Sequence, residues 1–307
     1  MSIVAEYAAL LHKKTPKTTP SGVACHPFTN EGELKNIQAV IFDIYGTLIN
    51  YSPIKLEEKQ KKDYQTEVFY KTAVEFGFLE TLKKIDPKIP PEITLANFYS
   101  GLLLMISEQA AKNGKQFFEP KVDDVWNLIL AILTRNGYEI EKYQIGDRNE
   151  FAKCIAYFFH FYSFGRSSLF ENAGTTLFEM KNQGIRLGLL ANTQFYTTIE
   201  LSLFLREDEI CEDYLDLFQK ELCLFSWDYE VSKQSGVLTR KLFDTLYDFD
   251  ILPTNTLFVS KNLSELQQMN EIGLKTALFC NDTPQQSQDF APDISFANYS
   301  ELAKIIL

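Results

Sequence analysis

The chain has 307 residues, of which 45% are hydrophobic and 23% charged, so a packed globular protein is expected rather than a disordered one. Its formal net charge of −11 argues against a general nucleic-acid binder, which needs a basic surface. An anionic substrate is still compatible with this charge, because the local charge of a site can oppose the net charge. The first residues lack the basic start and the apolar run of a secretion signal, and no stretch approaches the roughly 20 apolar residues that span a bilayer. We therefore expect a cytoplasmic protein that does not associate with membranes.

The cysteines suggest neither a disulfide framework nor a zinc site. Their number is odd, their spacing is wide, and no CxxC pair occurs. They are Cys25, Cys154, Cys211, Cys223 and Cys280. We interpret them as reduced thiols in the protein core.

Residues 1–36 form an N-terminal extension. Residues 3–11 have the pattern of a short amphipathic helix, whereas residues 15–28 are rich in Thr, Pro and Ser and indicate a linker or a surface segment. The sequence indicates no role for this extension.

The first strand of a buried sheet is predicted over residues 37–42. This run, Ile-Gln-Ala-Val-Ile-Phe, is compact and apolar on both faces, which is typical of a parallel strand covered on both sides. Asp43 follows at the carboxyl end of the strand, and Gly46 comes three residues later. Open α/β sheets bind their ligands at this end.

Residues 51–164 differ from the rest of the chain because their apolar residues recur with helical spacing and no convincing strand is found. Pro and Gly separate the predicted helices, which cover 56–76, 95–111, 122–136 and 149–161. We interpret this region as a helical domain inserted after the first strand.

Strands and helices alternate from residue 165 to the end, which predicts a doubly wound parallel sheet. The predicted strands are 186–190, 221–226, 256–259, 275–279 and 294–296. The predicted helices are 175–183, 241–249, 264–272 and 299–306. The α/β core thus comprises residues 37–50 and 165–307.

Polar residues follow the predicted strands, and in a parallel sheet they should meet at one edge. They are Asp43, the run Ala191-Asn192-Thr193, Lys233 in a loop after a strand, and the run Ser260-Lys261-Asn262. With Asp-x-x-Gly-Thr-Leu at residues 43–48 and Glu265 ending the last motif, this order resembles the four motifs of the haloacid dehalogenase (HAD) superfamily. The resemblance covers residues 37–307, although within 51–164 only the position and the helical character match.

The resemblance implies a HAD-like Rossmannoid core with a helical cap domain, and two-step nucleophilic substitution. Asp43 would be the nucleophile, attacking carbon or phosphorus, and water would then hydrolyse the covalent intermediate. Lys233 would hold Asp43 and stabilise negative charge, and Glu265 would orient or activate the water. A small anionic molecule would be the substrate. The residues expected to bind it are Ile44, Gly46, Thr47, Asn192, Thr193, Ser260, Lys261 and Asn262.

Several positions depart from the phosphatases of the superfamily. Tyr45 stands where they carry a second Asp as general acid, and a phenol with a pKa of about 10 is a poor proton donor near neutrality. The 2-haloacid dehalogenase branch also carries a Tyr there, and its halide leaving group needs no proton. The resemblance to this branch makes Tyr45 an expected catalytic residue beside Asp43, Lys233 and Glu265. That branch, however, uses an early cap arginine, whereas no arginine occurs between Asp43 and Arg135. Ala191 replaces the usual Ser or Thr of the second motif.

Lys261 bears on metal binding, because metal-dependent members place an Asp there. An ammonium group would repel Mg²⁺, so we expect no firmly bound metal. Lys261 either supplies positive charge in place of the metal or is a solvated surface lysine.

Three functional hypotheses remain. The first is a metal-independent HAD-like hydrolase acting on a haloacid or phosphate ester. The second is an atypical phosphatase with Mg²⁺ at Asp43 and Glu265. The third is a catalytically degenerate member kept as a binding or regulatory protein.

Overall fold

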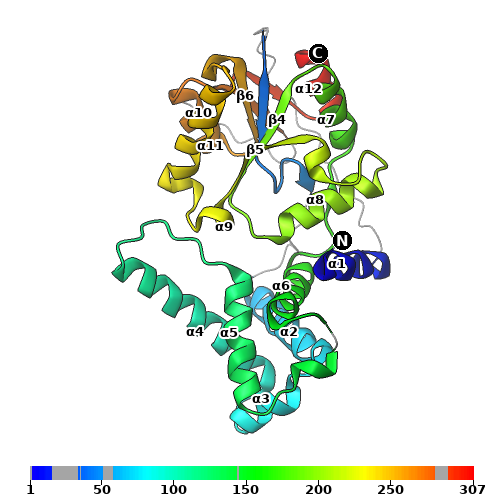
Figure 1. Cartoon of the computed structure of the whole chain (residues 1–307), viewed down its shortest axis with the longest axis vertical. Helices are drawn as coiled ribbons and strands as arrows, with labels where there is room; N and C mark the ends of the chain where they lie inside the picture. Colours follow the sequence, from blue (N-terminus) through cyan, green and yellow to red (C-terminus); the bar gives the residue numbers. More distant parts are fainter. Residues whose placement is uncertain (1, 16–33, 35, 51–57, 144, 281–289) are drawn as a thin grey trace. The chain divides into compact units, whose positions relative to one another are not determined.

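The computed structural model describes residues 2–15, 34, 36–50, 58–143, 145–280 and 290–307. The chain forms two compact units (Figure 1), a helical unit of residues 1–17 and 52–166 and an α/β unit of residues 18–51 and 167–307. The linker predicted over 15–28, with Cys25, lies outside the described residues except for Thr15. Within the described residues, no helix has both the length and the apolar character needed to cross a membrane.

Six of the described strands form one sheet in which every pairing is parallel. The strands are β1 (Ala39–Phe42), β4 (Arg186–Ala191), β5 (Phe218–Phe225), β6 (Thr256–Ser260), β7 (Lys275–Phe279) and β8 (Ile294–Phe296). Their order is β5-β4-β1-β6-β7-β8, so the chain runs outward from β1 to β5 and then returns to the other side of β1. This reversal of direction defines the switch point at which doubly wound sheets bind ligands.

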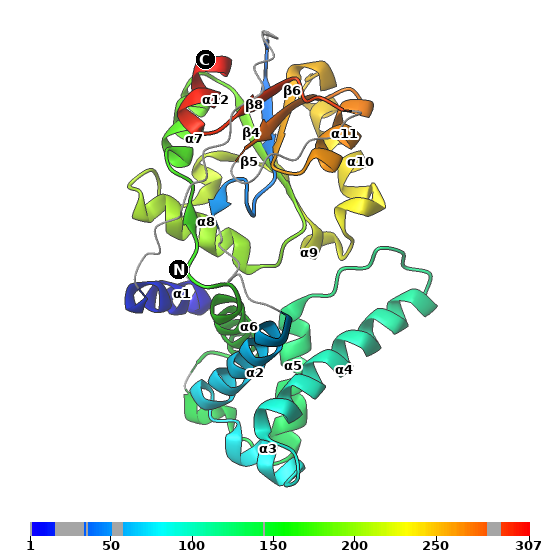
Figure 2. The same cartoon turned by 180° about the vertical axis from the view of Figure 1, so that it is seen from behind.

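Helices cover both faces of the sheet (Figures 1 and 2). On one face, α10 (Val237–Asp248) and α11 (Leu263–Glu271) belong to an apolar core that includes Leu242, Leu266 and, from the sheet, Phe258. On the other face lie α7 (Ala173–Asn182) and α12 (Tyr299–Ile306), where the hydroxyl of Thr176 donates to the backbone carbonyl of Tyr299 at 3.1 Å. The predicted fold class, a doubly wound parallel α/β sheet with an inserted helical domain, is confirmed.

Two short strands mark where the chain leaves and re-enters the α/β unit. β2 (Ile49–Asn50) pairs antiparallel with β3 (Ser168–Leu169), so the segments before and after the insertion lie side by side. The turn that follows Asp43 is therefore held between β1 and a paired strand.

The helical unit is built around aromatic side chains. Its helices are α1 (Ile3–Lys14), α2 (Glu58–Glu75), α3 (Leu79–Ile85), α4 (Pro91–Lys112), α5 (Val122–Arg135) and α6 (Arg148–Phe164), with a short 3₁₀ helix, η1 (Ile140–Tyr143). The rings of Phe69, Tyr99 and Trp126 all lie against Phe159 of α6, with centroids 4.7 to 5.4 Å apart. Burial of large aromatic rings supplies much of the apolar stabilisation of such a bundle.

Helix α1 belongs to the helical unit, a role that the sequence does not indicate. The side chains of Val4, Ala8, Leu11 and His12 are buried. The His12 ring nitrogen Nε2 lies 2.9 Å from the hydroxyl of Tyr157 on α6. The N-terminal helix therefore completes the core of the unit.

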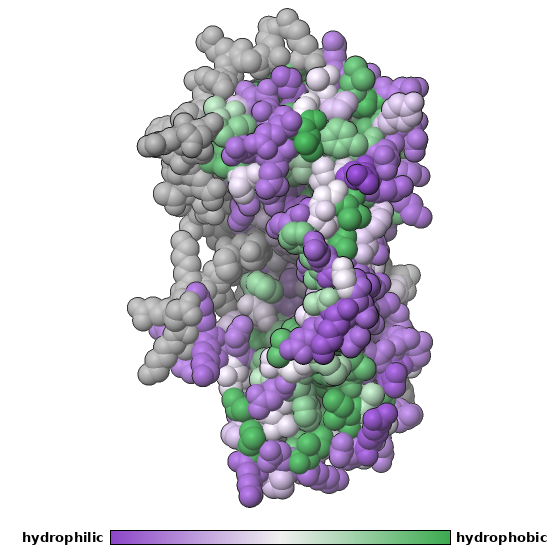
Figure 3. All heavy atoms as spheres, turned by 90° about the vertical axis from the view of Figure 1, so that its left-hand side faces the viewer, coloured by the Kyte–Doolittle hydropathy of each residue, from purple (hydrophilic) through white to green (hydrophobic). Residues whose placement is uncertain are grey.

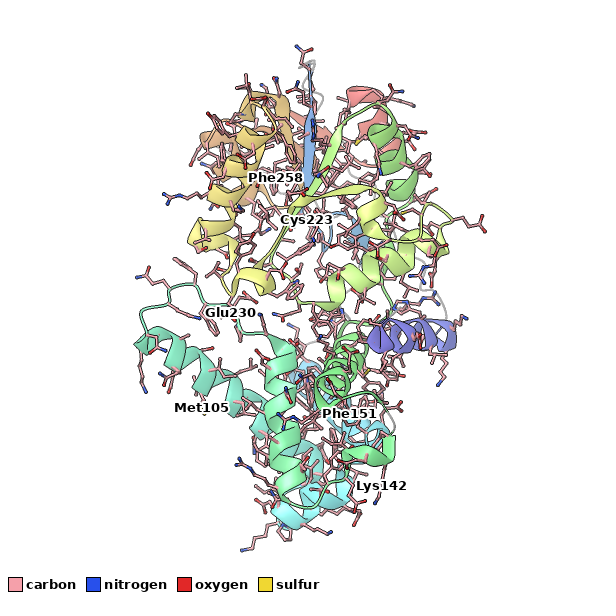
Figure 4. All side chains as sticks on the ribbon, in the orientation of Figure 1. Met105, Lys142, Phe151, Cys223, Glu230 and Phe258 are labelled. Carbon is pink, nitrogen blue, oxygen red and sulfur yellow. The ribbon has the colours of Figure 1, made fainter. Side chains whose placement is uncertain are left out.

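Helix α4 carries apolar side chains on its surface. Leu104 is 61% exposed and Met105 53%. Figure 4 places Phe151 and Phe258 in the interiors of the two units, whereas Met105 lies on α4. Hydrophobic residues are also visible on the surface of the molecule in Figure 3.

The described cysteines differ in burial. Cys154 and Cys280 are buried, as expected for core thiols, whereas Cys211 and Cys223 are half-buried. Cys211 and Cys223 are thus less buried than Cys154 and Cys280, although burial raises the pKa of the Cys223 thiol on β5.

Most predicted elements agree closely with those observed, but the helices α3 and α8 (Tyr196–Glu207) are absent from the prediction. The strands at 275–279 and 294–296 and the last helix have the predicted bounds, while β5 begins at Phe218 rather than at Glu221. The first turn of α8, Tyr-Thr-Thr-Ile, consists of aromatic and β-branched residues, which have low helix propensity.

Candidate active site

Asp43 lies at the switch point of the sheet. Its backbone N–H donates to the carbonyl of Val259 at 2.9 Å, which extends the pairing of β1 with β6 by one residue. The strands position Asp43 because their buried apolar side chains fix the register, with Phe42 opposite Val259. The side chain of Asp43 is 15% exposed, so it is sheltered but accessible.

The chain turns sharply after Asp43. The carbonyl of Ile44 accepts the N–H groups of Thr47, Leu48 and Ile49, at 3.1, 2.8 and 2.9 Å. Gly46 has φ of +79°, a conformation that glycine adopts at little cost. The side chain of Ile44 is fully buried, so only its backbone could meet a substrate.

Lys261 lies directly over this turn. A Cβ atom at Gly46 would be 2.7 Å from the Cδ of Lys261 and closer still to its Nζ. The backbone N–H of Lys261 also donates to Thr47 Oγ1 at 3.2 Å. Lys261 therefore packs against the turn that follows Asp43.

We predict that Gly46→Ala will lower both stability and activity. The substitution strains a left-handed backbone position and displaces the Lys261 side chain, so a loss of about 1–3 kcal/mol in unfolding free energy is expected. Urea unfolding would measure it, with Gly114→Ala as the control, because Gly114 also has positive φ but a Cβ added there would meet no atom within 4 Å. Equal losses of unfolding free energy in both variants would show that the clash with Lys261 does not contribute to the destabilisation.

Lys233 joins two carboxylates. Its Nζ donates to Asp43 Oδ1 at 3.0 Å and lies 2.8 Å from Glu265 Oε1. The three side chains are only 9, 15 and 20% exposed, in the order Lys233, Asp43 and Glu265. Burial lowers the pKa of Lys233, but the charges of Asp43 and Glu265 outweigh that effect, and the pKa is raised above 10.5. Lys233 is therefore a fixed positive charge at neutral pH.

Asn192 positions Lys233. Its Oδ1 accepts the backbone N–H of Lys233 at 2.7 Å, and its Nδ2 donates to Gln234 Oε1 at 3.2 Å. Asn192 follows β4, whereas Lys233 begins the short 3₁₀ helix η3 (Lys233–Ser235) after β5. The side chain predicted to bind substrate thus links two strand ends.

Ser260 and Asn262 organise the end of β6. Ser260 Oγ donates to Glu265 Oε2 at 3.2 Å and accepts the N–H of Asn262 at 3.1 Å. Asn262 caps helix α11 by accepting the N–H of Ser264 at 3.0 Å. These contacts orient Glu265 toward Lys233.

Thr193 lies beside the short helix α9 (Ser226–Tyr229) that follows β5. Its N–H donates to Ser226 Oγ at 2.9 Å, and that hydroxyl donates back to the Thr193 carbonyl at 3.1 Å. Thr193 Oγ1 is buried and has no hydrogen-bond partner in the described part of the chain. Buried hydroxyls are usually satisfied, so Thr193 Oγ1 is an exception to the usual pattern.

The hydroxyl of Tyr45 contacts two residues of helix α8. The hydroxyl donates to Glu200 Oε2 at 2.9 Å and lies 3.0 Å from Thr197 Oγ1. Burial and the charge of Glu200 raise the pKa of Tyr45 well above 10. The phenol is therefore a poor source of a proton for a leaving group.

Sequence reasoning misses Glu200 and Tyr299. Glu200 is 1% exposed and lies on helix α8, which the sequence pattern does not predict. Tyr299 lies on a predicted helix, but its hydroxyl donates to the Thr47 carbonyl at 2.6 Å, a contact across 252 residues. Burial and the charge of Asp43 raise the pKa of Tyr299 well above 10. Only the fold brings these residues to the turn.

Comparison with known proteins identifies the fold. No family model matches the sequence, and no curated protein is significantly similar to it. Among solved structures, a 2-haloacid dehalogenase from Pseudomonas syringae pv. Tomato DC3000 has a TM-score of 0.53 and 15% identity, covering 88% of this chain and 97% of its own. The chain has the haloacid dehalogenase fold.

Two other solved structures have lower TM-scores. A dehalogenase solved with an intermediate complex has 18% identity and a TM-score of 0.45, covering 88% of this chain and 97% of its own. The L-2-haloacid dehalogenase of Xanthobacter autotrophicus has 15% identity and a TM-score of 0.43, covering 88% and 98%. At these identities the likeness concerns the fold, and the chemistry has to be argued from the site.

Proposed function

We propose that this HAD-fold protein is a metal-independent hydrolase in which Asp43 attacks an electrophilic carbon of a small anionic substrate. The observation that carries the proposal is the contact between Asp43 Oδ1 and the Lys233 ammonium, 3.0 Å apart at the switch point of the sheet. The ammonium holds the carboxylate in place, as a nucleophile requires.

The proposed reaction has two steps. Asp43 displaces the leaving group, which departs with its electron pair, and an ester forms between Asp43 and the substrate carbon. Water then adds to the ester carbonyl and the ester bond to the substrate oxygen breaks, which regenerates Asp43 and releases the hydroxylated product. Glu265 accepts a proton from the water and returns it to the departing substrate oxygen, and Lys233 stabilises the oxyanion.

The environment of Tyr45 restricts the leaving group. Its hydroxyl donates to Glu200, and its raised pKa opposes proton transfer at neutral pH. A halide leaves without a proton, whereas an alkoxide requires one. This favours a haloacid over a phosphate ester.

The positive charges of Lys233 and Lys261 favour an anionic substrate. They also disfavour Mg²⁺ at the site. Lys233 bridges Asp43 and Glu265, the two carboxylates that would hold the metal, so Mg²⁺ at that position would have to displace the ammonium. Lys261 over the turn supplies a second positive charge. These residues do not fit a metal site.

A substrate panel with and without Mg²⁺ tests the proposal. We expect turnover of 2-chloropropionate that is unchanged within about twofold by Mg²⁺ or EDTA, and weaker or no hydrolysis of p-nitrophenyl phosphate. Mg²⁺-dependent phosphate hydrolysis would instead support the phosphatase, and no turnover of any compound would support the degenerate binding protein.

A further inference from the structure

We infer that Glu200 is a positioning residue that acts through Tyr45 to fix the turn after Asp43. This inference rests on the proposed function, in which the carboxylate of Asp43 must be held in an attacking position. Glu200 has no role in the two chemical steps and lies on a helix outside the predicted motifs.

The contact itself is buried and directional. Glu200 is 1% exposed, and its Oε2 accepts the Tyr45 hydroxyl at 2.9 Å. Because the phenol has one proton, which goes to Glu200, the contact with Thr197 Oγ1 at 3.0 Å has Thr197 as donor. Buried carboxylates are costly unless hydrogen bonded, so this arrangement favours a single position of the Tyr45 ring.

Tyr45 transmits that constraint to the backbone beside the nucleophile. It lies two residues after Asp43, and its backbone forms a bridge with Ile49 at the end of the turn. Thr47 holds the other side of the turn, through the N–H of Lys261 and the hydroxyl of Tyr299. The turn is thus fixed at two places, one on α8 and one shared by the end of β6 and α12.

Loss of the hydrogen bond between Glu200 of α8 and Tyr45 should lower kcat more than it weakens substrate binding. A misplacement of about 1 Å at a reacting group can cost about 100-fold in rate. Because Glu200 acts through a hydrogen bond that any carbonyl oxygen could accept, Gln should replace it and Ala should not. If the role of Glu200 depended on its negative charge, Glu200→Gln would lower kcat as much as Glu200→Ala does.

The test compares Glu200→Ala, Glu200→Gln, Tyr45→Phe and the Tyr45→Phe/Glu200→Ala double variant, with Glu179→Ala as an exposed-acid control on α7. With 2-chloropropionate, we expect Glu200→Ala to lower kcat about tenfold with KM within about twofold, and Glu200→Gln to recover most of that loss. The double variant should be no worse than Tyr45→Phe, because both substitutions remove the same hydrogen bond.

Amide hydrogen exchange of the peptide containing residues 43–50 gives a readout that needs no substrate. Exchange there should rise in Glu200→Ala and Tyr45→Phe but not in Glu200→Gln or Glu179→Ala. Unchanged exchange in Tyr45→Phe would overturn the inference, even if Glu200→Ala failed to fold. Turnover that survives Asp43→Asn would reject the proposed function while leaving the exchange result to stand.

Discussion

Replacement of Asp43 by Asn is expected to lower kcat by about 10⁴-fold or more, because an amide cannot form the covalent intermediate. The fold should survive, since the amide oxygen can still accept a hydrogen bond from Lys233 and Glu265 retains its ion pair. Steady-state kinetics would measure the loss, and urea unfolding would confirm that the variant is folded.

Asp244→Asn is the matched control, because it makes the same change at an exposed position of α10. It should retain the activity of the natural sequence. Activity of Asp43→Asn within about tenfold of the natural sequence would contradict the assignment of Asp43 as nucleophile.

Replacement of Lys233 by Met is expected to lower kcat about 10³-fold and to destabilise the protein by about 3 kcal/mol at neutral pH. The variant leaves Asp43 and Glu265 without the ammonium that both contact. Lys241→Met, which changes an exposed lysine on α10, is the control and should have little effect.

The pH dependence of that stability difference has a defined sign. The folded-state pKa of Lys233 is raised above the unfolded value of about 10.4, so its contribution is fully present below that value and is lost as pH rises through the folded-state pKa. Urea unfolding of the natural sequence and of Lys233→Met, from neutral pH to about pH 11, would measure how their stability difference changes with pH. A difference that grows as the pH rises through this range would contradict the ion-pair explanation.

The fold can be predicted largely from local patterns. Buried parallel strands form continuous apolar runs, and β7, β8 and α12 have the bounds that the sequence predicts. Helix α8 escapes prediction because its first turn has poor helix formers, and it is stabilised by burial in the tertiary structure. The packing of α1 on α6 cannot be read from local patterns because it joins His12 and Tyr157, which are 145 residues apart.

The candidate site is predictable where it depends on strand ends. Parallel topology brings Asp43, Lys233 and Glu265 together, and Lys233 contacts both carboxylates. The direction of a side chain is harder to predict. Asn192, which stays a predicted substrate-binding residue, also holds the Lys233 backbone, and Tyr45 reaches a buried acid on an unpredicted helix. Such contacts depend on the tertiary fold and leave no local pattern in the sequence.

The central claim is that Asp43 attacks carbon, and a single-turnover reaction in H₂¹⁸O tests it most directly. With enzyme in excess over 2-chloropropionate, water adds to the carbonyl of the Asp43 ester, so mass spectrometry should find ¹⁸O in the peptide containing Asp43 and not in the product. If ¹⁸O is found in the product after one turnover and not in that peptide, water has attacked the substrate directly and the account is contradicted.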